Sequence, residues 1–214
     1  MSEGAPADFE PVVAAARLLS DLSVPWWITG GWSIDLAVGH LTRSHDDVDV
    51  LLLEADAPAL QELRGVDLQL FSGPSDERRV WTSGRKLRAG ADRVQLESPL
   101  LLQPTSVLFG AASDSNWVYH RGKPTITRPL ADLTVTCDQI PCLAPEVTLA
   151  MKAMSGRPKD DHDFWVVLPR LDGAQREWLA DAVARRWASA RRRAGDPASD
   201  AERHPWVRAL RDAR

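Results

Sequence analysis

Two consecutive glycines, Gly30 and Gly31, constrain most strongly how this chain can fold. An apolar run at 26–29 precedes them, and residues 32–38 carry a short helical pattern. This order predicts a buried strand, a tight glycine turn and a helix. Backbone N–H groups at such a helix N-terminus bind phosphate oxygens, and glycine permits a close approach. We therefore expect Gly30 and Gly31 to hold phosphate, with an added contact from the Ser33 hydroxyl.

Two acidic residues, Asp47 and Asp49, lie on the next predicted strand. Alternate residues of a strand point to one face, so the two carboxylates stand side by side while Val48 and Val50 enter the core. Like charges this close need a cation, and paired carboxylates suit Mg2+ that also binds substrate phosphates. An Asp-Val-Asp sequence alone is equally typical of a solvated strand end. Combined with the glycine turn, the pair predicts a metal site for displacement at phosphorus.

The pattern of the chain changes near residues 140–144. Before this point, short apolar runs separated by Gly and Asp indicate strands, and a helix is expected at 57–63. After it, helical patterns follow at 146–154, 158–168, 174–192 and beyond Pro205. We therefore predict an α+β fold with two domains, 1–142 and 143–214, and a ligand cleft between them.

Composition narrows the class of protein. The 214 residues carry a formal net charge of −4, which argues against nucleic acid and favours a cationic partner. No run approaches the roughly 18 consecutive apolar residues of a membrane helix. The N-terminus lacks the basic start and apolar stretch of a secretory signal. Cys137 and Cys142 are too few for a disulfide framework and have no zinc spacing. We expect a cytoplasmic protein that does not bind membranes.

The stretch WITGGWSIDLAVGHLTRSHDDVDV, residues 27–50, resembles the motif of the aminoglycoside and lincosamide nucleotidyltransferases of the polymerase-beta-like superfamily. The stretch APEVTLAMKAMSGRPKDDHDF, residues 144–164, is similar to the helical segment of 2''-type aminoglycoside adenylyltransferases. The resemblance implies a nucleotidyltransferase fold, with a small mixed β-sheet flanked by helices and a helical C-terminal part.

The same resemblance implies a reaction and its ligands. Mg2+ would lie on Asp47 and Asp49, and the triphosphate on Gly30, Gly31 and Ser33. The implied reaction moves a nucleoside monophosphate, AMP from ATP, to a hydroxyl of a small molecule such as an aminoglycoside or a related antibiotic.

Three basic residues of these stretches each have two interpretations. Arg43 contacts phosphates, or it braces its loop through a carboxylate. His45 orients the acidic pair, or it is an ordinary loop histidine. Lys152 is our preferred ligand for the β and γ phosphates, steadied by ion pairs to Asp160 and Asp163, although an exposed helix lysine is the usual case.

The resemblance also implies a third carboxylate on a neighbouring strand, which completes the metal site or accepts the proton of the attacking hydroxyl. We predict Glu97 as this catalytic residue, ahead of Asp92 and Asp67. An alignment anchored on residues 117–119 instead puts Ser106 there. The chain would then be a slow enzyme, or a catalytically impaired nucleotide-binding homologue with a regulatory or antitoxin-like role. A nucleotidyltransferase toxin that modifies a protein or an RNA end is a further hypothesis.

Overall fold

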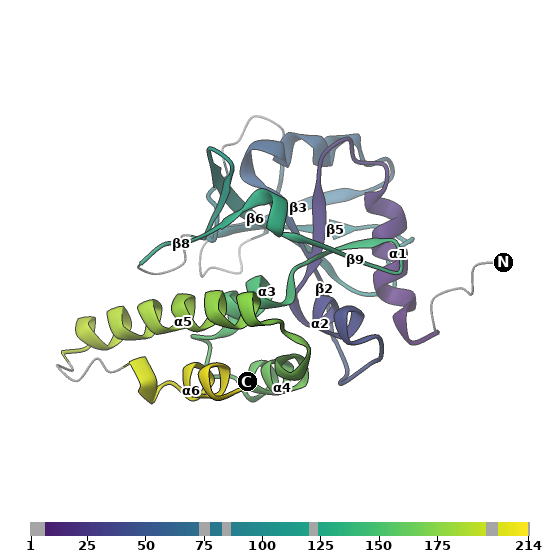
Figure 1. Cartoon of the computed structure of the whole chain (residues 1–214). Helices are drawn as coiled ribbons and strands as arrows, with labels where there is room; N and C mark the ends of the chain where they lie inside the picture. The colour runs from purple at the N-terminus through teal and green to yellow at the C-terminus, as the bar shows by residue number, and fades with distance from the viewer. Residues whose placement is uncertain (1–6, 73–77, 83–86, 120–123, 196–200, 214) are drawn as a thin grey trace.

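The computed structural model describes residues 7–72, 78–82, 87–119, 124–195 and 201–213. A twisted sheet forms one side of the molecule, and the helices of the C-terminal part form a layer against it (Figure 1). None of the helices in the described ranges combines the length and apolar character that crossing a membrane requires.

The strands join in one sheet. They are β1 (Trp26–Thr29), β2 (Val48–Leu53), β3 (Asp67–Ser72), β4 (Arg78–Val80), β5 (Asp92–Glu97), β6 (Thr105–Ser113), β7 (Asn116–Tyr119), β8 (Ile126–Pro129), β9 (Thr134–Cys137) and β10 (Ile140–Leu143). The main path runs β4-β3-β5-β6-β2-β1-β10-β9, and β7 and β8 extend from β6. β1 pairs with β10 and β2 with β6 in parallel, whereas the other pairs are antiparallel. The mixed sheet predicted from the sequence is therefore confirmed.

The helices lie on both faces of this sheet or pack on one another. They are α1 (Glu10–Leu19), α2 (Gly30–Val38), α3 (Pro145–Lys152), α4 (Pro158–Val167), α5 (Gly173–Arg193) and α6 (Pro205–Asp212). Short 3-10 segments occur at Ala7–Phe9, Glu54–Glu62, Leu130–Asp132, Leu168–Arg170 and Ala201–Arg203. The predicted helical C-terminal part is confirmed.

Two details of the sequence-based assignment were wrong. The segment 57–63 was expected to be an α-helix, but the chain forms a 3-10 helix over Glu54–Glu62 with Pro58 inside it. Proline has no backbone N–H to donate and its ring crowds the preceding turn, so a regular α-helix is disfavoured there. The strands β8, β9 and β10 were not predicted, because each has only four residues and their apolar residues give no long pattern.

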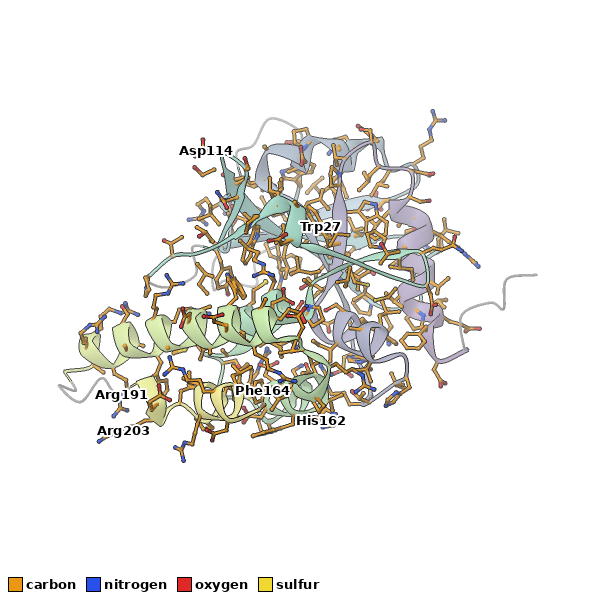
Figure 2. All side chains as sticks on the ribbon, in the orientation of Figure 1. Trp27, Asp114, His162, Phe164, Arg191 and Arg203 are labelled. Carbon is orange, nitrogen blue, oxygen red and sulfur yellow. The ribbon has the colours of Figure 1, made fainter. Side chains whose placement is uncertain are left out.

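The two faces of β2 enter two different hydrophobic clusters. Val50 packs in the cluster that includes Leu19 of α1, whereas Leu51 belongs to the cluster that includes Val147 and Phe164 of the helical part. Phe164 lies among these helices (Figure 2) and stacks on Trp206, with ring centroids 4.4 Å apart. The sheet and the helical part therefore share a core, and the division at residues 142 and 143 stays a prediction.

A buried carboxylate also ties the two parts together. Asp163 of α4 is fully buried and accepts two hydrogen bonds from the Arg43 guanidinium, at 2.8 and 3.0 Å. The Lys152 ammonium of α3 lies 2.7 Å from its second oxygen. Arg43 stands in the loop before β2, so Asp163 fixes this loop relative to the helices. A buried charge with two cationic partners is costly to disrupt, because each partner left behind loses its counter-charge.

We predict that Asp163→Ala lowers the free energy of unfolding by about 3–5 kcal/mol, since both cations then remain partly buried without this carboxylate. Urea denaturation measures the loss. Asp132→Ala is the control: its carboxylate is 52% exposed and lies 3.9 Å from Arg128. That change should cost less than about 1 kcal/mol. Equal losses for the two variants would contradict a central role for Asp163.

Candidate active site

The glycine turn lies directly against Asp49. Gly30 begins α2 with a φ of +72°, a left-handed conformation that glycine adopts without a steric cost. A Cβ placed on Gly30 would lie 2.6 Å from Asp49 Oδ2. The strand register explains this proximity, because Thr29 at the end of β1 pairs with Asp49 of β2. The turn and the carboxylate can therefore occupy these positions only if residue 30 has no side chain.

The Ser33 hydroxyl supports the turn from within the protein. Ser33 is fully buried, and its Oγ donates to the Gly30 carbonyl oxygen at 3.1 Å. The same atom lies 3.2 Å from the Thr148 hydroxyl of α3, which also lies 3.4 Å from the Thr29 hydroxyl. In this conformation Ser33 is not among the residues that line the cleft. Its position favours a bracing role over the predicted phosphate contact.

Arg43 and His45 hold the loop that leads into β2. Besides the two bonds to Asp163, Arg43 Nη1 lies 3.0 Å from His45 Nδ1. His45 Nε2 lies 2.6 Å from Asp35 Oδ2. Arginine has no acceptor, so His45 Nδ1 accepts and its Nε2–H donates to Asp35. Of the interpretations open for Arg43 and His45, these contacts match a loop brace and not a contact with the acidic pair.

Gly31 is part of the same brace. A Cβ on Gly31 would lie 2.3 Å from Arg43 Nη2 and 2.4 Å from His45 Nδ1. The absence of a side chain lets the start of α2 pack against both of these residues. Burial alone would raise the pKa of Asp35, but hydrogen bonds from His45 and Thr42 lower that pKa overall. The loop is therefore fixed by a charged carboxylate beneath the second glycine.

Asp35 and Thr148 support the site but were not predicted as site residues. Asp35 is a fully buried acid inside an otherwise apolar helix, and Thr148 is a buried hydroxyl in α3. A charged residue within an apolar helical pattern is rarely buried without a partner, so the pattern around Asp35 could have indicated this role. Thr148 carries no comparable signal, because its partners lie more than a hundred residues away.

The paired carboxylates both line the cleft, but only Asp49 lies on the strand that was predicted to carry both, because β2 begins at Val48. Asp47 is exposed just before β2, and Asp49 is half-buried on that strand. Burial, and to a lesser degree the charge of Asp47, raise the pKa of Asp49 to about 6 against the opposing charge of Lys152. Burial and a neighbouring negative charge both disfavour the charged form of a carboxylate. A bound cation stabilises that charged form. Two carboxylates at one edge of the cleft also match the ligands that Mg2+ uses beside substrate phosphates.

These residues open onto a cleft of about 750 Å³ between the sheet and the helical part. The size is in the range of sites that hold nucleotides and other small molecules. Its lining residues come from both parts: Thr29, Gly30, Asp47, Asp49, Arg93, Leu108, Tyr119, Thr148, Met151, Lys152, Met154, Ser155, Arg157, Arg186, Ala190 and Arg193. The predicted ligand site between the two parts thus corresponds to a real cavity.

Lys152 lines this cleft and is held in position by two buried acids. Its Nζ lies 3.1 Å from Asp160 Oδ1 and 2.7 Å from Asp163 Oδ2. Arg157 lines the cleft as well, and its Nε lies 2.8 Å from Asp160 Oδ2. Burial tends to raise the pKa of Asp160, but hydrogen bonds from Ser155 and Arg157 lower it overall. Lys152 therefore has the location expected of a phosphate ligand, with its side chain only 10% exposed.

The strand register places Ser106, not an acid, beside Asp49. Ser106 of β6 pairs with Asp49 on one side and with Gln95 of β5 on the other. Glu97 lies two residues beyond Gln95 on the same face of β5, and it does not line the cleft. Two strand spacings, about 10 Å, separate its strand from β2. Within the described residues, no group of three His, Cys, Asp or Glu side chains is arranged to hold a metal ion.

The other acids considered for that role are engaged elsewhere. The Asp92 carboxylate accepts from the Arg88 backbone N–H and from Arg88 Nη2, each at 2.9 Å. Asp67 pairs with Glu97 across β3 and β5, which puts it one strand further from Asp49. Ser106 is therefore the residue directly beside Asp49, and Glu97 as the third carboxylate stays a prediction.

Comparison with solved structures defines the class of fold. The lincomycin-bound lincosamide antibiotic adenylyltransferase LnuA has a TM-score of 0.51 at 17% identity, over 73% of this chain and 94% of that one. The antibiotic-resistance factor ANT(2'')-Ia, in its solution structure, has a TM-score of 0.53 at 15% identity, over 86% and 95%. The fold is that of the antibiotic nucleotidyltransferases, as the sequence predicted.

Sequence comparison finds similarity to one family over part of the chain. Residues 12–88 match the model of the aminoglycoside-2''-adenylyltransferase family. The 2''-aminoglycoside nucleotidyltransferases of Escherichia coli and Klebsiella pneumoniae are each 46% identical over 39 residues, which is 18% of this chain. That stretch spans only 20% of the length of these relatives. The chain is therefore similar to 2''-aminoglycoside nucleotidyltransferases over part of its length, and its fold resembles that of the two solved nucleotidyltransferases.

Two glycine substitutions separate the steric role of Gly30 from its backbone conformation. Gly30 and Gly39 both have left-handed φ angles, +72° and +85°, but a Cβ on Gly39 would have no atom within 4 Å. We predict that each Ala variant loses about 1 kcal/mol or more of stability from backbone strain. Only Gly30→Ala should also displace Asp49 and weaken Mg2+-dependent nucleotide binding, measured by calorimetry. Equal binding by both variants would show that the contact with Asp49 is unimportant.

Proposed function

We propose that this protein is a metal-dependent nucleotidyltransferase that moves AMP from ATP to a hydroxyl group of a small molecule. The observation that carries the proposal is the packing of the Gly30 turn against Asp49, beside Asp47, at the edge of a cleft that Lys152 also lines. This arrangement combines a phosphate-binding turn, a pair of metal ligands and a fixed cation within one cavity. The family matches and the fold support the same reaction.

Asp47 and Asp49 are the residues that would hold Mg2+ in this proposal. When bound, the ion supplies neutralisation of phosphate charge and alignment of the attacking and leaving oxygens. The two carboxylates fit it because both line the same edge of the cleft, and because burial and the charge of Asp47 raise the pKa of Asp49. Without a cation, the two negative charges would repel a polyanion and weaken its binding at this edge of the cleft.

The triphosphate would lie between the glycine turn and α3. Backbone N–H groups of Gly30 and Gly31 at the start of α2 supply donors, and the N-terminal end of the helix dipole favours negative charge. Lys152 supplies a positive charge from the opposite wall, oriented by Asp160 and Asp163. Ser33 and Arg43 contribute in this proposal by fixing the turn and the loop, through the contacts that each makes inside the protein.

The first test measures pyrophosphate release from ATP with Mg2+ over a panel of aminoglycosides and lincosamides. We predict that Asp49→Asn lowers release by about a hundredfold or more, a loss typical of removing an electrostatic contribution at a reaction centre. Asp46→Asn is the matched control, because Asp46 is an exposed acid of the same loop that does not line the cleft. Pyrophosphate release by the Asp46→Asn variant should stay within about twofold of that of the unsubstituted protein.

Two outcomes would count against the proposal. One is the absence of release with every acceptor and every nucleoside triphosphate, together with no Mg2+-dependent nucleotide binding. The other is an equal loss of activity in the Asp46 and Asp49 variants, which would trace the effect to net charge and not to the metal site.

The residue at the third-carboxylate position gives a second test. Glu97 stays our predicted proton acceptor. The variant Glu97→Gln should therefore lower kcat and leave the affinity for the nucleotide unchanged. Ser106→Asp adds a carboxylate directly beside Asp49. We predict that it lowers the Mg2+ concentration needed for half-maximal nucleotide binding, because a third oxygen ligand becomes available. Ser106→Ala removes only the hydroxyl and should leave this concentration unchanged. A higher Mg2+ requirement for Ser106→Asp would contradict the placement of the metal on this side of Asp49.

A further inference from the structure

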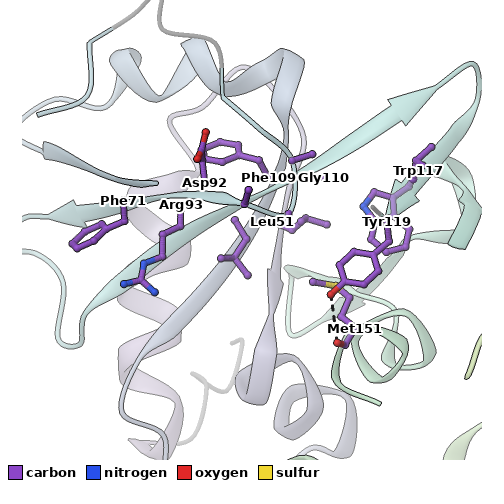
Figure 3. Close-up of a pocket in the computed structure, with 14 residues that line it drawn as sticks. Leu51, Phe71, Asp92, Arg93, Phe109, Gly110, Trp117, Tyr119 and Met151 are labelled. Carbon is purple, nitrogen blue, oxygen red and sulfur yellow. Dashed lines mark hydrogen bonds between the residues drawn. The ribbon is translucent and has the colours of Figure 1, made fainter. Parts of the chain in front are cut away.

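A second cavity, of about 180 Å³, adjoins the cleft (Figure 3). We call it the aromatic pocket; it is lined by Leu51, Phe71, Ala89, Gly90, Ala91, Asp92, Arg93, Leu108, Phe109, Gly110, Trp117, Val118, Tyr119 and Met151. Four of these residues also line the cleft: Arg93, Leu108, Tyr119 and Met151. The two cavities therefore share a wall. The smaller one has the size for part of a ligand whose remainder lies in the cleft.

The aromatic pocket lies on the same sheet face as the acidic pair. Leu51 follows Asp49 by two residues on β2, so their side chains share a face. Leu51 pairs with Leu108 of β6, and Leu108 pairs with Arg93 of β5. In the order β5-β6-β2-β1, this pocket is thus on the β6 and β5 side of Asp49, whereas the glycine turn is on the β1 side.

In an in-line transfer, the β1 side and the β6 side of Asp49 would hold different ligands. The attacking oxygen must approach phosphorus opposite the leaving pyrophosphate. If the β and γ phosphates lie at the Gly30 turn, beside β1, the acceptor hydroxyl approaches from the β6 side. There the O–P bond to the acceptor forms as the bond to pyrophosphate breaks, and the hydroxyl proton passes to the predicted proton acceptor, Glu97. The acceptor then has the aromatic pocket within its reach.

Trp117 presents an unsatisfied hydrogen-bond donor at this pocket. Its side chain is fully buried, and its indole Nε1 has no hydrogen-bond partner among the described residues. That nitrogen lies directly against Gly110, since a Cβ there would lie 2.5 Å from it. In Figure 3 the indole nitrogen faces the Gly110 side of the cavity. A buried donor without a partner is costly, so an acceptor atom of a ligand at this point is stabilising.

The charges at the junction are positive. Arg93 is exposed where the two cavities meet, and its guanidinium lies 4.7 Å from the Phe71 ring centroid. The Asp92 carboxylate is bound to Arg88 and points away from the cavity in Figure 3. Within the described chain, the only acids that line the cleft are Asp47 and Asp49, which the metal would occupy. An ammonium group of an acceptor at this junction would therefore be repelled by Arg93, whereas a neutral or anionic group would not.

We propose that the aromatic pocket is the acceptor subsite, and that the acceptor is a neutral or anionic hydroxyl compound. Its apolar group enters the pocket and offers an oxygen to the Trp117 indole N–H. This inference rests on the proposed nucleotidyl transfer. It differs from the expectation based on net charge, because the charges that matter to a ligand are those that line its site.

The first experiment measures acceptor charge preference by calorimetry, on the full chain saturated with Mg2+ and a non-hydrolysable ATP analogue. The probes are phenyl β-D-glucuronide, phenyl β-D-glucoside and tobramycin, which are anionic, neutral and polycationic. We expect both phenyl glycosides to bind more tightly than tobramycin. Arg93→Glu should weaken glucuronide binding by about fivefold and strengthen tobramycin binding, as expected for a partly exposed charge. Arg185→Glu, on an exposed part of α5 that lines neither cavity, should change neither.

The second experiment tests the pocket itself. Trp117→Phe keeps an aromatic ring and removes only a donor that has no partner in the described protein, so the fold should be retained. We expect a loss of about threefold to tenfold in phenyl glucoside affinity, the usual effect of one hydrogen bond. Ala91→Phe, from an exposed position on the pocket wall, should fill the space and reduce binding of both phenyl glycosides. Thermal unfolding of each variant shows whether the fold is intact.

The outcomes distinguish this inference from the proposed function. Tightest binding of tobramycin, or unchanged glycoside binding in the Trp117 and Ala91 variants, would overturn the inference while nucleotide binding persists. Weaker binding of the ATP analogue by Trp117→Phe, without any acceptor, would assign the pocket to the nucleobase and also overturn it. Failure of the unsubstituted protein to bind the Mg2+-bound analogue would refute the proposed function itself.

Discussion

The buried carboxylate of Asp163 is the interaction on which the geometry of the cleft depends. It binds Arg43 from the loop before β2 and Lys152 from α3, and Lys152 lines the cleft. Hydrophobic packing joins the sheet to the helices, but it is not directional and leaves small shifts possible. The charged hydrogen bonds of Asp163 are directional, so they fix the loop before β2 and α3 relative to each other.

The glycine turn adds a second constraint of a different kind. Gly30 and Gly31 do not bind their neighbours; they permit contacts that any side chain would prevent. Gly30 lets the backbone reach Asp49, and Gly31 lets α2 reach Arg43 and His45. The turn, the loop and the strand therefore form one rigid unit around the two carboxylates. A rigid unit suits phosphoryl-group chemistry, in which position and charge contribute most of the rate enhancement.

A serine, Ser106, lies beside Asp49, whereas the resemblance implies a third carboxylate on a neighbouring strand. Ser106 takes that place because β2 and β6 pair in a register that brings it beside Asp49. The cleft beyond the metal ligands is lined by cationic and aromatic side chains and not by further acids. The glycine turn with the acidic pair and the cavity wall beyond them are built on different strands, so one can change while the other is kept.

The sequence by itself determined the features that depend on nearby residues: the strand, glycine turn and helix around Gly30, and the shared face of Asp47 and Asp49. Both follow from periodicity and backbone conformation within some twenty residues. Only the tertiary structure decided which partners Arg43, His45 and Ser33 have, which residue lies beside Asp49, and where the Trp117 indole N–H points. Those outcomes depend on strand register and on packing between segments far apart in the chain; Arg43 and Asp163, for example, are 120 residues apart. No local pattern encodes such contacts.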